Sequence, residues 1–190
     1  MNVLLIGPPG SGKGTQGTRL ANRLGLRHIA AGDLLRDEVQ RGTELGRSVQ
    51  DHVDSGRLVP DDLIIDLVMP VVVEAARTGG YLLDGFPRTV AQAELASQWR
   101  APGQRDEIAP PDAVIVLDAD ADVLVERTLA RGRTDDTDVV VRHRLDVYEN
   151  ETAPVIAWFQ DLGVVHHVDG TAPVEAVSDA ILAELDVPRA

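Results

Sequence analysis

The 190-residue sequence has no cysteine, a single lysine and no apolar run at its start that is long enough to span a membrane. Without cysteine the chain can form neither a disulfide nor a thiolate metal site, and the reducing cytoplasm is its expected compartment. The first apolar run, Val3 to Ile6, is too short for a signal peptide or a membrane span. We therefore expect a cytoplasmic protein with no membrane partner.

Positive charge is also scarce. The formal net charge is -13, which argues against a nucleic-acid polymer as partner because polyanions are bound by broad basic surfaces. A small anion in a local basic pocket remains compatible with this charge. The 18 basic residues are all arginine except Lys13. Either this lysine falls there by chance, or the site needs a compact ammonium on a flexible stem.

The chain alternates short apolar runs with helical patterns. At 190 residues and 44% hydrophobic content, it fits one domain with one sizeable core. Strands are predicted at Val3 to Ile6, His28 to Ala30, Tyr81 to Leu83, Ala113 to Leu117 and Val164 to Val168. Helices are predicted at Gly12 to Leu24, Gly32 to Gln40, Leu45 to Ser55, Asp61 to Thr78, Val90 to Trp99, Ala121 to Ala130, Val139 to Asp161 and Val174 to Leu185. This pattern predicts an α/β fold with a parallel sheet covered on both faces.

Three local features qualify that pattern. Pro70 should kink or interrupt its helix because it removes a backbone donor. The polar segments Ala31 to Val59 and Gly132 to Asp138 do not resemble core, and we expect both to be mobile excursions from the sheet. The proline-rich segment Ala101 to Pro111 is expected to be a surface loop.

A glycine-rich segment, GPPGSGKGT at Gly7 to Thr15, lies between the first strand and the first helix. In that context, backbone N–H groups and the helix N-terminus can hold phosphate, and the lysine can bridge the outer phosphate oxygens. The alternative is a glycine-rich turn with an accidental lysine. Gly14 stands where the general motif has Ser or Thr, so a magnesium-side hydroxyl would have to come from Thr15.

Two further candidates end the strand Tyr81 to Leu83. Asp84 can organise magnesium and its waters, although an Asp in this position is often only a turn starter. Arg88 follows at the carboxyl end of the same strand, where open α/β sheets bind ligands. An arginine there suits an anionic substrate.

Eight stretches together resemble the adenylate kinases, within the wider nucleoside monophosphate kinase family. They occur in the family's order along the whole chain: GPPGSGKGT, AGDLLR at Ala31 to Arg36, GRLVPD at Gly56 to Asp61, LLDGFPRT with Gln92, ER with Arg131, RTDD at Arg133 to Asp136, RHR at Arg142 to Arg144, and VDGT at Val168 to Thr171. The resemblance implies a five-stranded parallel P-loop core at 1–29, 60–126 and 138–190. It also implies a helical segment for the nucleoside monophosphate at 30–59 and a short lid at 127–137, within one kinase domain over 1–190.

The resemblance also implies roles for individual residues. For ATP they are Gly10, Ser11, Gly12, Lys13, Gly14, Thr15, Arg127, Arg131 and Ala172. For AMP they are Ala31, Arg36, Arg57, Leu58, Val59, Gly85, Phe86, Pro87, Arg88, Gln92, Arg133 and Arg144. The catalytic set is Lys13, Arg88, Arg133 and Arg144. Magnesium, carried with ATP, would be held by Thr15 and Asp84 through water, and the short lid leaves no zinc-binding option.

The implied reaction is reversible transfer of a phosphoryl group from ATP to AMP, giving two ADP, by a monomeric enzyme. Two residues bear on the acceptor. Ala31 is typical of UMP/CMP kinases where adenylate kinases usually have Thr, whereas Gln92 is typical of adenylate kinases. A UMP/CMP kinase on the same fold is the nearest alternative, and a P-loop ATPase or switch module without an acceptor is a distant one.

Spacing adds expectations for the charged residues near the lid. Arg127 and Arg131 are four apart on a predicted helix, so they should share one face, although a solvated basic face has the same pattern. Arg142 and Arg144 lie two apart, so only one should enter the site, and the resemblance selects Arg144. Asp135 and Asp136 could pair with the lid arginines or simply favour solubility. The five histidines show no ligand spacing, and we assign them no chemistry.

Overall fold

The computed structural model describes residues 1–99, 109–132 and 136–187. Five parallel strands form one sheet in the order β2-β3-β1-β4-β5. The strands are β1 (Asn2–Ile6), β2 (Arg27–Ala30), β3 (Tyr81–Asp84), β4 (Ala113–Asp118) and β5 (Val165–Asp169). The predicted α/β class with a five-stranded parallel sheet is confirmed.

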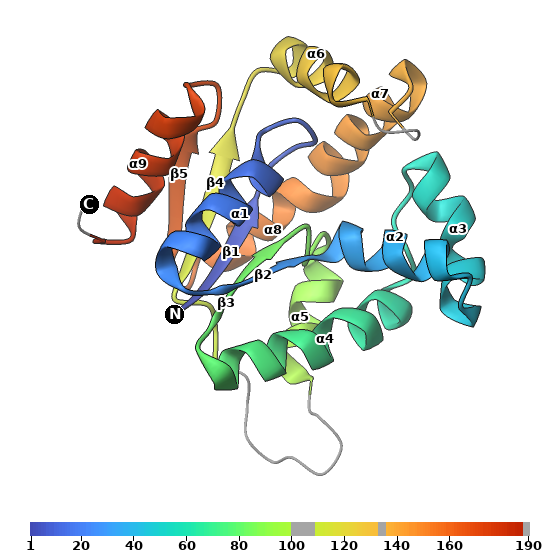
Figure 1. The fold of residues 1–190 in the computed structure, drawn as a ribbon, viewed down its shortest axis with the longest axis horizontal. Coiled ribbons are helices and arrows are strands. Elements are labelled where there is room, and N and C mark those ends of the chain that lie inside the picture. Colours follow the sequence, from blue (N-terminus) through green and yellow to red (C-terminus); the bar gives the residue numbers. More distant parts are fainter. Residues whose placement is uncertain (100–108, 133–135, 188–190) are drawn as a thin grey trace.

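The helices that connect the strands cover both faces of this sheet (Figure 1). They are α1 (Lys13–Leu24), α2 (Ala31–Arg41), α3 (Glu44–Ser55), α4 (Asp61–Thr78), α5 (Val90–Gln98), α6 (Ala121–Arg131), α7 (Asp138–Val147), the π-helical turn η1 (Tyr148–Thr152), α8 (Ala153–Gln160) and α9 (Val174–Glu184). Within the described ranges, no helix combines the length and apolar character that a membrane crossing requires.

Alternation along β1 explains the two covered faces. Leu4 and Ile6 point into a cluster with residues of α4, α5 and α8, whereas Val3 and Leu5 point into a second cluster with residues of α1 and α9. All four side chains are at most 4% exposed. A strand that is apolar on both sides therefore fixes the central position of β1 in the sheet, between β3 and β4.

Two helix predictions need correction. The interruption expected at Pro70 does not occur, because α4 runs unbroken from Asp61 to Thr78 with Pro70 on its exposed side. Buried residues on both sides of Pro70, including Val68 and Val72, hold the two halves of α4 against the core. The long helix predicted from Val139 to Asp161 is three consecutive segments, because η1 replaces the α-helical pattern in its middle.

The two helix pairs α2–α3 and α6–α7 lie beyond the carboxyl ends of the strands (Figure 1). They contact each other through α7, since Arg144 donates a hydrogen bond to the carbonyl of Val53 in α3. Gly56, which caps α3 at φ +75°, allows this approach: a Cβ there would lie 2.9 Å from Cγ of Arg144. The carboxyl ends of the strands and these two pairs enclose one region of the molecule.

Candidate nucleotide-binding site

A cavity of about 860 Å³ opens at the carboxyl ends of the strands. Its wall comes from the loop after β1, the end of β3, α2, the end of α3, α6, α7, η1 and the loop after β5. The cationic side chains on the wall are Lys13, Arg36, Arg57, Arg88, Arg127, Arg131 and Arg144, and the acidic ones are Asp33 and Asp84. In an otherwise acidic chain, this local excess of positive charge fits a polyanionic ligand.

The loop between β1 and α1 has the geometry of a phosphate-binding loop. Gly10 has φ +86°, and a Cβ there would lie 2.6 Å from the carbonyl oxygen of Leu124 and from Oγ1 of Thr128. Gly12, at φ +94°, forms the N-cap of α1 with no side-chain capping bond, and the first residues of this helix line the cavity. Free backbone N–H groups at a helix N-terminus favour phosphate.

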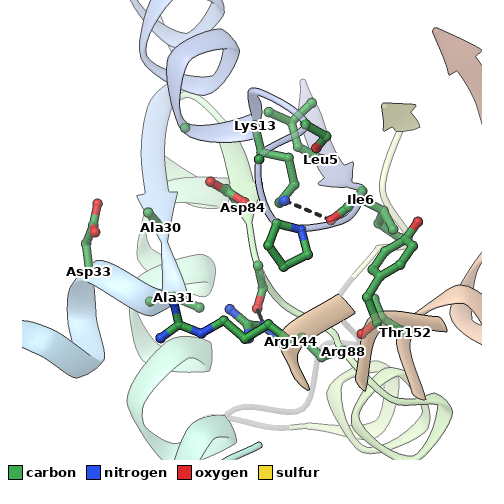
Figure 2. Close-up of a pocket in the computed structure, with 18 of the residues that line it drawn as sticks. Leu5, Ile6, Lys13, Ala30, Ala31, Asp33, Asp84, Arg88, Arg144 and Thr152 are labelled. Atoms are coloured by element: carbon green, nitrogen blue, oxygen red, sulfur yellow. Dashed lines mark hydrogen bonds between the residues drawn. The ribbon is translucent and has the colours of Figure 1, made fainter. Parts of the chain in front are cut away.

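Lys13 folds back over this loop. Its ammonium donates hydrogen bonds to the carbonyl oxygens of Gly7, at 2.7 Å, and Pro8, at 2.9 Å (Figure 2). Desolvation lowers the pKa of Lys13 to about 8, with Asp84 opposing the shift and Arg88 and Arg131 adding to it. The loop therefore holds a compact cation whose charge is costly until an anion approaches.

Arg88 lies across the cavity from this loop, close to Arg144 (Figure 2). Its Nε donates to the carbonyl oxygen of Gly85 at 2.9 Å. The Arg88 side chain is open to solvent where it lines the cavity. The protein around its guanidinium still displaces much of the water, and this desolvation lowers the pKa of Arg88. Asp84 opposes the shift, while Arg144 and Arg36 add to it. Several guanidinium groups thus face one space, an arrangement that an anionic substrate would stabilise.

An acidic side chain links an arginine of α6 to an arginine of α7. The carboxylate of Asp136 accepts hydrogen bonds from Arg131, at 2.8 and 2.9 Å, and from Arg144, at 2.9 Å. Its side chain is 0% exposed, so this is an enclosed contact between α6 and α7. The expected pairing of Asp136 with lid arginines is confirmed, while Asp135 lies outside the described residues.

Arg127 and Arg131 share one face of α6 as their spacing predicts. Arg127 donates to the carbonyl oxygens of Gly170 and Thr171, at 2.7 and 2.9 Å, and so joins α6 to the loop after β5. Arg131 and Ala172 also line the cavity. Arg142, in contrast, is 64% exposed on its side chain and pairs with Asp138, so of the two α7 arginines it is Arg144 that faces the cavity.

Most residues singled out from the sequence meet on this wall. They are Gly10, Ser11, Gly12, Lys13, Gly14, Thr15, Ala31, Arg36, Arg57, Leu58, Val59, Asp84, Gly85, Pro87, Arg88, Gln92, Arg127, Arg131, Arg144 and Ala172. Phe86 does not line the cavity, because its side chain is 2% exposed and packs in the core. Arg133 lies outside the described residues.

Sequence reasoning missed other wall residues. Tyr148 and Thr152 reach the cavity from η1, and burial raises the pKa of Tyr148 to about 12, so it stays a neutral phenol. His28 and His52 also line the cavity, and each has one buried ring nitrogen without a hydrogen-bond partner in the described part of the chain. Buried polar atoms without partners are uncommon and often face ligands or water. No local motif marks either histidine.

The donor set for a metal ion is small. Among the described residues, no group of three or more His, Cys, Asp or Glu side chains could hold a metal ion. The wall does carry the carboxylate of Asp84 and the hydroxyl of Thr15 near the phosphate loop. Magnesium usually binds through one or two protein carboxylates, its own waters and the substrate phosphates, so this pair fits Mg²⁺ held with a nucleotide.

The parallel sheet, the glycine loop before α1 and the arginine-lined cavity define a P-loop nucleotide-binding protein. A family model described as adenylate kinase matches residues 5–164. The adenylate kinase of Kocuria rhizophila is 45% identical over 193 residues, which cover 97% of this chain and 98% of that protein. The adenylate kinase of Corynebacterium urealyticum is 43% identical over 186 residues, covering 98% and 99%. The chain therefore belongs to the adenylate kinase family.

The pKa of Lys13 gives the site a testable pH dependence. The ordinary pKa of 10.5 falls to about 8 on burial, so in the free protein about half of the Lys13 side chains have lost this proton at pH 8. A bound triphosphate would restore the charge, so nucleotide binding above pH 8 should take up a proton and weaken by up to about tenfold per pH unit. Calorimetry of ATP binding at pH 7 and pH 9, in buffers of different ionisation enthalpy, measures this uptake.

The same shift affects stability with a definite sign. Between pH 8 and 10.5 the unfolded chain binds more protons at Lys13 than the folded one, so this group makes folding more favourable as pH rises through that window. Lys13→Arg is the control for binding, because arginine stays protonated. Equal proton uptake at pH 7 and pH 9 in the unmodified protein would contradict the prediction.

Proposed function

We propose that this protein catalyses the reversible transfer of the terminal phosphoryl group of ATP to AMP, giving two ADP, and so maintains the balance of adenine nucleotides. The observation that carries the proposal is one cavity with a P-loop lysine on one side and an arginine cluster, with Arg88 at its centre, on the other. The membership of the adenylate kinase family supports it, and the curated relatives above carry that enzyme name. Neither a UMP/CMP kinase nor a P-loop switch is favoured by these relatives.

On the donor side, we assign ATP to Gly10–Thr15, Arg127, Arg131 and Ala172. The backbone N–H groups of the loop and the ammonium of Lys13 would bind the β- and γ-phosphates, because the loop faces the cavity and its lysine is held there. Mg²⁺ bound with ATP would neutralise phosphate charge, and Asp84 and Thr15 would hold its waters. The base would lie toward Arg127 and the loop after β5.

On the acceptor side, we assign AMP to Ala31, Gly85 and Pro87, to Arg36, Arg88 and Arg144, to the stretch 57–59, and to Gln92. Arg36 and Arg88 would clamp the AMP phosphate, which is ionised at neutral pH and needs no general base to act as nucleophile. An AMP phosphate oxygen forms a bond to the γ-phosphorus, the bond to the β–γ bridging oxygen breaks, and ADP leaves. The residues orient the two nucleotides and stabilise the charge on the transferring group.

We also propose that the segments 30–59 and 132–138 close over the two nucleotides and exclude water. Arg144 in α7 donates hydrogen bonds to Val53 in the first segment and to Asp136 in the second, so one side chain connects both segments to the core. Hydrogen exchange with and without a two-nucleotide bisubstrate inhibitor tests it. We expect slower exchange in both segments, and unchanged exchange in both would reject closure.

The direct test of function is a panel of acceptors. ATP with magnesium is supplied with AMP, UMP, CMP or GMP in turn, or with none, and ADP formation is followed. The proposal expects fast turnover with AMP alone in the set. Equal ADP formation without an acceptor would favour an ATPase, and preference for UMP or CMP would favour the related kinase. We further propose a cytoplasmic monomer, which chromatography with light scattering tests for its oligomeric part.

A further inference from the structure

Gln92 is an unusual polar residue because it lies on the cavity wall and yet is only 2% exposed. It is the third residue of α5, where Thr89 is the N-cap and its hydroxyl accepts a hydrogen bond from the backbone N–H of Gln92. A buried amide must find partners for its oxygen and its nitrogen. The identity of those partners fixes what the amide can present to a ligand.

Two partners set the orientation of this amide without ambiguity. The backbone N–H of Arg88 donates to Oε1 of Gln92 at 2.7 Å, and Nε2 of Gln92 donates to Oδ1 of Asp61 at 2.8 Å. A backbone N–H can only donate and an ionised carboxylate can only accept. The amide oxygen must therefore face Arg88 and the amide nitrogen must face Asp61.

Helix capping explains only half of this arrangement. A Gln three residues after a Thr N-cap commonly reaches back to a backbone N–H, and the bond from Arg88 resembles that pattern. The bond to Asp61 has no part in capping α5, since Asp61 is the first residue of α4 and lies 31 positions earlier. Asp61 itself does not line the cavity, so it can act there only through Gln92.

The fixed amide keeps one N–H and one oxygen lone pair, since its only side-chain hydrogen bonds among the described residues are these two. A donor beside an acceptor complements the edge of a 6-aminopurine, which offers a ring-nitrogen acceptor beside an amino donor. A 6-oxopurine in the same pose offers the reverse pattern. To match it, the amide would have to turn over and lose both of its bonds, with its oxygen against a carboxylate.

We propose that Asp61 is a positioning residue that, by holding the Gln92 amide in one orientation, selects AMP over 6-oxopurine monophosphates such as GMP. The inference rests on the proposed function, because it assumes that the acceptor base lies against Gln92. It adds a specificity determinant outside the cavity wall. Because the two hydrogen bonds of the Gln92 amide form within the folded protein, the preference for AMP is set before any nucleotide binds.

Asp61→Asn is the sharpest test. Asparagine has the same shape, but its amide can either accept from Gln92 or donate to it, so the constraint at Asp61 is lost and only the bond from the Arg88 backbone N–H still opposes a flip of Gln92. The ratio of kcat/KM for AMP to that for GMP should fall by about tenfold or more. This is the effect expected when one hydrogen bond no longer discriminates between the two bases. KM for ATP and kcat with AMP should stay close to the unmodified values. Because both acceptors are measured on one preparation, partial unfolding cancels from the ratio.

Two comparisons separate positioning from structure. Asp62→Asn removes the neighbouring charge from the same first turn of α4, and we expect the AMP-to-GMP ratio to be unchanged. In a Gln92→Ala background, Asp61→Asn should cause no further change of the ratio, because the two residues act as a unit. An unchanged ratio in Asp61→Asn alone would overturn the inference while leaving AMP phosphorylation intact. Failure of the unmodified protein to phosphorylate AMP would instead reject the function on which it rests.

Discussion

Replacing Arg88 with alanine is expected to lower kcat by about a thousandfold or more, the loss associated with a transition-state arginine. The guanidinium faces the cavity across from Lys13, where negative charge would develop during transfer. Stability should change little, because removing Arg88 ends its desolvation and its repulsion with Arg144 and Arg36, which offsets the loss of its attraction to Asp84 and of its bond to Gly85. Steady-state ADP formation and thermal unfolding, measured on the same preparation, check both halves.

Matched variants make the Arg88 result specific. Arg142→Ala removes an arginine that points away from the cavity and pairs with Asp138, so turnover should stay near normal. Arg88→Lys keeps the charge but lacks the planar fork, and it should recover only part of the lost turnover. Near-normal turnover of Arg88→Ala would remove this residue from the transfer step.

The distribution of charge explains how an acidic protein can bind polyanionic substrates. The net charge of -13 is spread over the chain, whereas the cavity wall gathers cations from six separate segments of sequence. Grouping them costs solvation, and the lowered pKa values of Lys13 and Arg88 are the sign of that cost. Phosphate groups would offset it, so the site is built to be most stable when nucleotides fill it.

The sequence predicts well whatever depends on one continuous segment. The β1 strand, its glycine loop and Lys13 follow from local pattern, because a short continuous apolar run followed by regularly spaced glycines is typical of a buried strand and a tight loop. Asp84, Arg88 and this loop line the same cavity because β3 pairs with β1 in parallel, so the carboxyl ends of the two strands lie side by side. The positions of these residues on one wall are therefore a consequence of topology that the alternating pattern predicts.

Contacts between distant elements could not be predicted in this way. Asp61 meets Gln92, and His28 and His52 reach the cavity, only because α3, α4, α5 and β2 pack at particular angles. The π-helical turn at Tyr148–Thr152 could not be predicted for a different reason. The pattern of apolar residues does not distinguish a helix with one extra residue in a turn from a regular α-helix. Phe86 was assigned to the site by its place in a motif, but its side chain turns into the core.

Replacing Lys13 with methionine is expected to lower kcat/KM for ATP by about a thousandfold, because the site loses the cation that contacts the outer phosphates. Methionine has a similar length but no charge, so the change isolates the ammonium. The loop also loses the bonds from Nζ to Gly7 and Pro8, but it no longer buries a charged group, and these opposed effects should leave thermal stability close to that of the unmodified protein. Calorimetry should show a much weaker ATP affinity.

The acceptor side provides the internal control for this variant. Arg36, Arg88 and Gln92 do not depend on the hydrogen bonds of Lys13, so the affinity for AMP should be unchanged in Lys13→Met. Loss of both affinities together would indicate that the loop has collapsed into the cavity instead of losing one contact. Turnover within tenfold of the unmodified protein would show that phosphate is held by the backbone of the loop alone, and the single lysine of the sequence would then have no part in transfer.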